Sequence, residues 1–170
     1  MNDLIPIRFR LNGIDRKAAV EPNQVLADLL RDDLGQTDVR VSCDQGVCGV
    51  CSVLVDGVPV TACLTPAFRA DGCEIVTAKG LASGSDALSD VQRAFVDVSA
   101  FQCGFCTPGM VISATALLAA HPAPDRATIV GWLGANVCRC TGYQMIIEAI
   151  ELAAARRAET LHVRIGEPAD

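Results

Sequence analysis

CDQGVCGVC, residues 43–51, constrains the fold of this 170-residue chain more than any other segment. Its three cysteines stand at C-x4-C-x2-C spacing, and Cys63 follows as a fourth. Four thiolates on a tight loop suit a [2Fe–2S] cluster, because two thiolates must reach each of two irons. Gly46 and Gly49 lie inside the loop, where glycine permits positive φ and lets backbone N–H groups approach the cluster sulfurs. The predicted ligands of this first cluster are Cys43, Cys48, Cys51 and Cys63.

A structural zinc site is the alternative for this loop. Zinc sites generally use cysteine pairs at C-x2–4-C spacing. A loop that carries three cysteines and two glycines has the spacing of plant-type ferredoxins instead. We therefore favour the diiron cluster.

A second set of four cysteines occupies the other half of the chain at C-x2-C-x31-C-x-C spacing: Cys103, Cys106, Cys138 and Cys140. By spacing alone this set could hold zinc or a second [2Fe–2S] cluster. Thr107 suits a helix N-cap and Pro108 the first helical position. Cys106 would then lie at the positive end of a helix, which favours an anionic cluster. Arg139 is either a further positive charge at this site or an ordinary surface charge.

The ninth cysteine, Cys73, precedes a short β-like run and is predicted not to be a ligand. The segment Met1–Gly13 lacks the apolar block of a secretory signal. Cytosolic thiols stay reduced, and nine cysteines, an odd number, cannot all form pairs. The cysteines therefore indicate metal binding rather than disulfides. We expect a cytoplasmic protein.

Composition excludes several classes of function. The net charge is −6, and no dense cluster of lysine and arginine indicates nucleic-acid binding. The longest nearly apolar stretch, Met110–Ala120, is too short to span a membrane. The chain has no G-x-G-x-x-G fingerprint, no P-loop and no convincing nucleophile–base pattern. These observations predict an electron carrier with no catalytic residues of its own.

The first half, residues 1–78, reads as a small mixed sheet with one helix. Strands are predicted over residues 5–11, 16–20, 52–55, 58–61 and 74–77. Asn12-Gly13 and Asp56-Gly57 provide hairpin turns. A helix is expected between an N-cap at Asn23 and a C-terminal glycine at Gly35. A sheet crossed by one helix, with a cysteine loop at its edge, is a β-grasp ferredoxin arrangement.

The second half reads as helical. Residues 79–85 (KGLASGS) form the predicted linker, residues 86–160 the helical domain and residues 161–170 a tail. Four helices are expected to begin near Leu88, Thr107, Asp125 and Thr141, and short connections make them a four-helix bundle. The predicted fold class is therefore α+β, with a β-grasp domain followed by a helical bundle.

Three segments carry a family resemblance. Residues 43–51 resemble the first cluster loop of the molybdenum hydroxylase (xanthine oxidase) family. Residues 102–109 (QCGFCTPG) resemble its second cluster loop, and residues 136–143 (NVCRCTGY) are similar to its third signature. The resemblance covers about residues 4–157. The chain is similar to the separate small iron–sulfur subunit of bacterial carbon monoxide, quinoline, isoquinoline and nicotine dehydrogenases.

The resemblance implies two [2Fe–2S] clusters in this chain and two partner subunits. A large subunit would hold molybdopterin with molybdenum and a medium subunit FAD, in an (αβγ)2 assembly. This chain would be the non-catalytic electron-transfer subunit of the oxidoreductase. Electrons would pass from the molybdopterin site to the C-terminal cluster, then to the N-terminal cluster and on to FAD.

The resemblance also implies roles for individual residues. Gln102 and Cys140 would contact the pterin of the large subunit, and the loop holding Gly46 and Gly49 would face the flavin. It assigns no role to Cys73 or to the tail. The alternative function is a free-standing ferredoxin-type carrier, which would have no use for the second set of cysteines.

Overall fold

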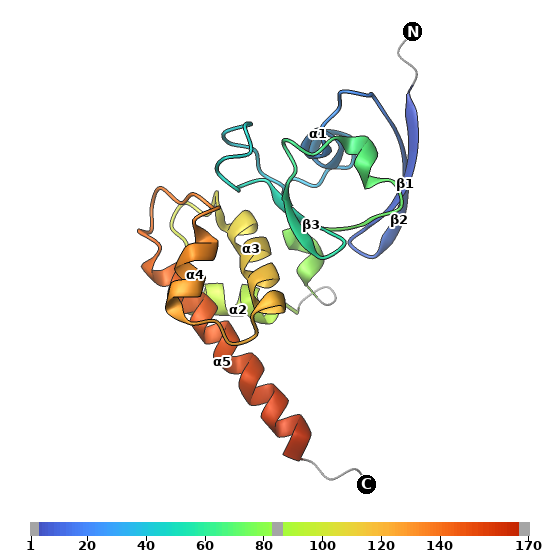
Figure 1. Ribbon diagram of the computed structural model, residues 1–170. Coiled ribbons are helices and arrows are strands. Elements are labelled where there is room, and N and C mark those ends of the chain that lie inside the picture. Colours follow the sequence, from blue (N-terminus) through green and yellow to red (C-terminus); the bar gives the residue numbers. More distant parts are fainter. Residues whose placement is uncertain (1–3, 83–86, 167–170) are drawn as a thin grey trace.

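The computed structural model describes residues 4–82 and 87–166, with side chains as far as Glu159. These residues form a mixed α+β structure in which a five-stranded sheet precedes a group of helices (Figure 1). Among the described residues, none of the helices combines the length and the apolar character needed to cross a membrane.

The sheet follows the predicted strands closely. Its strands are β1 Ile5–Leu11, β2 Ile14–Val20, β3 Ser52–Val55, β4 Val58–Thr61 and β5 Glu74–Val76. In space the order is β2-β1-β5-β3-β4. Only β1 and β5 pair in parallel, while the two hairpins and the β3–β5 pair are antiparallel. Both hairpin turns have positive φ at Asn12-Gly13 and Asp56-Gly57, as those sequences predict.

The helix of the first half begins later than the sequence predicts. It consists of α1, Leu26–Asp28, continued by the π-helical segment η1, Leu29–Asp33. Asn23 is not its N-cap, because the first N–H groups are satisfied by the chain after β4. Leu26 N donates to Thr65 O at 2.7 Å and Ala27 N to Ala62 O at 3.0 Å. A side-chain cap is unnecessary where tertiary partners take these donors.

The helices of the second half are α2 Asp90–Asp97, α3 Thr107–Ala120, α4 Arg126–Leu133 and α5 Gln144–Gly166. Asp125 caps α4 as predicted, since its carboxylate accepts the N–H of Thr128 at 2.8 Å. The predicted cap of α3 is wrong by one residue: Cys106, not Thr107, is the N-cap, and Cys106 O accepts the N–H of Met110. Helix α5 continues through Gly166, into the segment predicted as a tail.

Two short 3-10 helices complete the described structure. The first, η2, covers Ala67–Ala70. The second, η3, covers Ala78–Leu81 and occupies the start of the predicted linker. Part of that linker, and the end of the predicted tail, fall outside the described residues.

Two hydrophobic cores form, and a small cluster joins them. One core lies between the sheet and α1–η1, with Phe9, Leu30 and Ile75 fully or almost fully buried. The other lies among α2–α5, with Phe95 and Ile146 at its centre. The joining cluster places Leu54 of β3 against Ile112 and Ala116 of α3. Helix α3 thereby packs directly on the sheet half, as Figure 1 shows.

An ion pair between α2 and α5 makes a testable contribution to stability. Arg157 binds both oxygens of Asp90, with Nη2 at 3.1 Å from Oδ1, and holds the pKa of Asp90 below its usual 3.8. At pH 7 Asp90→Asn is expected to lower the free energy of unfolding by about 1 kcal/mol. A carboxyl with a lowered folded-state pKa stabilises above its unfolded pKa and loses that effect as the pH falls through the folded value. The difference should therefore shrink below about pH 4.

The measurement is denaturant unfolding of the native protein and the variant at several pH values. Their difference is compared, because acid also releases metal from thiolates in both. Asp15→Asn is the matched control: its carboxylate lies 3.7 Å from Arg10 and is 93% exposed, so no measurable change is expected. A loss at Asp90→Asn that persisted unchanged in acid would contradict the assignment.

Candidate metal centres

The first thiol loop, residues 43–51, has a backbone shaped to surround an anion. Asp44, Gly46 and Gly49 all have positive φ, between 54° and 69°. The N–H groups of Gln45 and Cys48 both point at Cys43 Sγ from 3.4 Å. These donors stabilise the thiolate and lower the pKa of Cys43 to about 6. The loop therefore provides the inward-facing amides that a negatively charged cluster requires.

The glycines of this loop lie where a side chain would overlap with neighbouring atoms. A Cβ at Gly46 would lie 2.4 Å from Leu64 Cδ1, and one at Gly49 would lie 2.4 Å from Ala135 O. Both positions have positive φ, which favours glycine. At Gly49 the overlap with the backbone oxygen of Ala135 is a second reason, whereas the exposed side chain of Leu64 can turn away from Gly46.

The thiols of the first set (Cys43, Cys48, Cys51 and Cys63) lie in pairs. Cys43 interacts with Cys48, and Cys51 with Cys63, which follows β4. Burial raises the pKa of Cys51 to about 11. A bound metal would displace that proton, because metals bind the thiolate.

The second set of thiols also lies in pairs. Each pair joins one cysteine near the start of α3 to one cysteine in the loop before α5. Cys140 Sγ lies 3.5 Å from Cys103 Sγ, and both residues are exposed. Cys106 interacts with Cys138, and burial raises the pKa of Cys106 to about 12. The pKa of Cys138 is lowered: burial opposes the shift, and hydrogen bonds from Thr141, whose Oγ1 is 3.1 Å from Sγ, outweigh it.

Both sets fit a diiron cluster, which needs two thiolates at each iron. Among the side chains described, those of residues 4–82 and 87–159, no three His, Cys, Asp or Glu are placed to hold a single metal ion. Next to Cys106, the buried hydroxyl of Thr107 has no protein partner. A cluster bound beside it would supply a sulfur acceptor for that hydroxyl.

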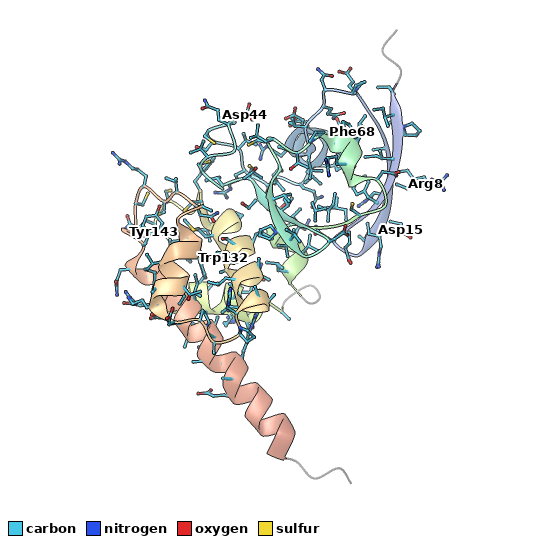
Figure 2. All side chains as sticks on the ribbon, viewed as in Figure 1. Arg8, Asp15, Asp44, Phe68, Trp132 and Tyr143 are labelled. Atoms are coloured by element: carbon cyan, nitrogen blue, oxygen red, sulfur yellow. The ribbon has the colours of Figure 1, made fainter. Side chains whose placement is uncertain are left out.

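Tyr143 holds the second set in place, a role the sequence did not reveal. Its hydroxyl accepts the N–H of Cys138 at 2.9 Å and donates to Asn136 O at 3.0 Å. Tyr143 itself has φ of 67°, a strained value for a residue with a side chain. The asparagine and tyrosine at the two ends of the 136–143 signature are thus joined by one hydrogen bond. Figure 2 shows Tyr143 in the helical half, apart from Asp44 at the tip of the first loop.

The two cysteine loops contact each other directly. Val137 N donates to Cys48 O at 2.8 Å, and the buried Asn136 donates through Nδ2 to Gly49 O at 3.0 Å. From α3, Gly109 approaches so closely that a Cβ there would lie 2.5 Å from Gly49 O. A backbone hydrogen bond therefore joins the peptide of one predicted ligand, Cys48, to the residue before another, Cys138.

The remaining predicted residues lie as follows. Gln102 is exposed and precedes Cys103, so it lies at the same exposed edge as Cys140. Arg139 is exposed between the last two cysteines. Cys73 belongs to neither set: its thiol is 3.3 Å from Arg69 O, and its charged neighbours are Asp56, Asp71 and Arg69. All nine cysteines are free thiols within the described residues.

Exposed apolar side chains accompany both sets of thiols. Val47 lies in the first loop and is 69% exposed, and Leu64, which follows Cys63 directly, is 58% exposed. Phe101, Phe105 and Val137 are exposed beside the second set. Clusters of this kind on a folded chain indicate surfaces that other proteins cover.

Two sequence families match the chain. The family described as "2Fe-2S iron-sulfur cluster binding domain" matches residues 9–82. The family described as "[2Fe-2S] binding domain" matches residues 77–151. Each match covers one of the two sets of thiols.

Whole-length similarity extends to proteins of known activity. The chain is 46% identical to the nicotine 6-hydroxylase small subunit of Paenarthrobacter nicotinovorans, over 88% of this chain and 89% of that protein. It is 44% identical to the nicotinate dehydrogenase small FeS subunit of Eubacterium barkeri, over 91% and 98%. In structure it resembles a chain of quinoline 2-oxidoreductase from Pseudomonas putida 86, with a TM-score of 0.85 and 46% identity over 92% and 99% of the two chains.

Proposed function

Because the chain belongs to the molybdenum hydroxylase family, as one of its small iron–sulfur subunits, we propose that its two thiol sets are the two ends of an electron path between partner subunits. The chain is an electron-transfer subunit of an oxidoreductase complex and contains two [2Fe–2S]-binding domains. When bound, a [2Fe–2S] cluster accepts and releases one electron.

The proposed ligands are the two sets described above, with Cys43, Cys48, Cys51 and Cys63 in one and Cys103, Cys106, Cys138 and Cys140 in the other. Their arrangement in pairs and the N–H groups directed at Cys43 support this assignment. Within the chain we propose a β-grasp domain over residues 1–78, a linker over 79–85, a helical domain over 86–160 and a tail over 161–170. The two hydrophobic cores support the division.

The observation that carries the proposal is the hydrogen bond from Val137 N to Cys48 O, 2.8 Å long. Val137 is covalently bonded to Cys138. A continuous path of covalent bonds and one hydrogen bond therefore connects the two thiol sets. Packing of Gly109 and Asn136 against the first loop holds that contact in place. We propose that electrons enter at the C-terminal set and leave from the N-terminal set.

The proposed partners are a large molybdopterin-binding subunit and a medium FAD-binding subunit, in an (αβγ)2 assembly. The small subunits named above belong to larger enzymes, which supports such partners. Exposed Gln102 and Cys140 would contact the pterin, and the first loop with Val47 would face the flavin. Free thiols throughout agree with a cytoplasmic location.

Gln102→Ala tests the proposed entry point. In the assembled complex, this variant should slow reduction of the clusters by the enzyme's substrate about tenfold, because one hydrogen bond to the pterin is lost. Iron content and both cluster EPR signals should stay native. The measurement is stopped-flow reduction followed by cluster absorbance.

Gln45→Ala is the matched control. It removes a glutamine that is also exposed, from the other thiol loop, and keeps the backbone N–H that donates to Cys43. Reduction by substrate should be unchanged in this control. Equal rates for Gln102→Ala and the native complex would contradict the proposed pterin contact.

A further inference from the structure

Arg40 belongs to one half of the molecule and acts on the other. It lies three residues before Cys43, in the segment that leads into the first thiol loop. Its Nη1 donates to Gly104 O at 2.8 Å, and its guanidinium carbon lies 5.3 Å from the centroid of the Phe105 ring. Gly104 and Phe105 are the two residues between Cys103 and Cys106.

This contact suits the geometry of the loop it reaches. Gly104 has φ of 74° and lies outside the helices and strands, and its carbonyl also accepts the N–H of Thr107 at 3.4 Å. A planar guanidinium can donate to that carbonyl and cover an aromatic face at the same time. A lysine ammonium, a compact point charge on a flexible stem, cannot reproduce both contacts together.

Arg40 also places a fixed positive charge beside the second set of thiols. A reduced cluster carries one more negative charge than an oxidised one, so a nearby cation favours reduction. Arg40 is half-buried, so solvent screens its charge less than that of exposed Arg139.

We propose that Arg40, a residue of the first half, is a positioning residue for the second cluster: it fixes the Cys103–Cys106 loop and raises the reduction potential of the cluster bound there. The inference rests on the proposed function, because it requires a cluster at that set. It makes the potential of the C-terminal cluster dependent on the packing of the two halves.

The test is an EPR-monitored redox titration of the complete complex carrying Arg40→Gln. We expect the second cluster to become about tenfold harder to reduce, a shift of about 59 mV for a one-electron couple. The first cluster should shift less. Arg40→Lys keeps the positive charge, so the second cluster should recover most of its native potential. Loss of the planar guanidinium should broaden the EPR signal of that cluster.

Arg31→Gln is the matched control. Arg31 is a half-buried arginine of the same half, and its Nη1 donates to Val39 O, next to Arg40. This control should leave both potentials native, even where it lowers thermal stability. The potential therefore separates a role at the second cluster from a general structural one.

The outcomes distinguish a failure of the inference about Arg40 from a failure of the proposed function. Arg40→Gln with native potentials, or with equal shifts at both clusters, overturns the role of Arg40. A native complex without two cluster signals overturns the proposed function instead. If the Arg40→Gln complex does not assemble, Arg40→Lys decides. A native EPR signal of the second cluster would overturn the positioning role of the guanidinium. A broadened signal at near-native potential supports the proposal.

Discussion

Cys48→Ser is expected to reduce the iron content from about four to about two atoms per chain and to abolish one of two cluster signals. Cys48 is almost fully buried, pairs with Cys43 and carries the carbonyl that binds Val137. A serine hydroxyl does not ionise as a thiol does, so one iron loses a ligand. Iron analysis and EPR of the dithionite-reduced complex measure both effects.

The same variant tests the order of the two clusters in the path. The second cluster should still be reduced by substrate, whereas the flavin of the partner subunit should no longer be reduced during turnover. Cys73→Ser is the matched control, because Cys73 lies in neither thiol set, and it should keep full iron and both signals. Survival of both signals in Cys48→Ser would refute the assignment of Cys48.

Gly109→Ala is expected to destabilise the protein by about 2–3 kcal/mol and to weaken the contact between the two thiol loops. A Cβ at this position would lie 2.5 Å from Gly49 O and 2.8 Å from Val50 O. Both neighbours are backbone atoms, which cannot turn aside as the end of a flexible side chain can. Helix α3 must therefore move away from the first loop, and the hydrogen bond between Val137 and Cys48 should lengthen.

Gly131→Ala gives the opposite sign and serves as the control. Gly131 lies within α4, and nothing stands within 4 Å of a Cβ built there. Alanine should stabilise this variant by about 0.5–1 kcal/mol, through lower backbone entropy in the unfolded chain. Thermal unfolding of both variants, with the rate of electron transfer between clusters, checks the pair. A stabilised Gly109→Ala would contradict the close packing.

Local sequence signals predicted the sheet well. The hairpin Ser52–Thr61 follows from its Asp-Gly turn, and the alternation of Ile5–Leu11 marks a strand with one buried face. The cap at Asp125 follows equally from a short-range rule. Each of these signals acts between residues only a few positions apart.

Predictions from local sequence rules were wrong where backbone groups distant in sequence supply the hydrogen bonds. The helix at Leu26 needs no cap at Asn23, because carbonyls of Ala62 and Thr65 accept its first N–H groups. The final helix runs through Gly166, beyond the boundary that its composition indicated. Arg156 and Arg157 of this helix bind Asp97 and Asp90 of α2.

The sequence by itself determined the two sets of cysteines, the strands with their turns and the family. The strands and turns follow from patterns over a few residues, and the family from three short signatures. The spacing of the first cysteine set indicates a diiron cluster, whereas 31 residues separate Cys106 from Cys138 and the spacing of the second set alone left zinc open. Only the tertiary structure placed Arg40 against Gly104 and Asn136 against Gly49, 64 and 87 residues apart. No periodicity or spacing indicates such pairs, because they arise where two distinct cores pack against each other and bring distant loops together.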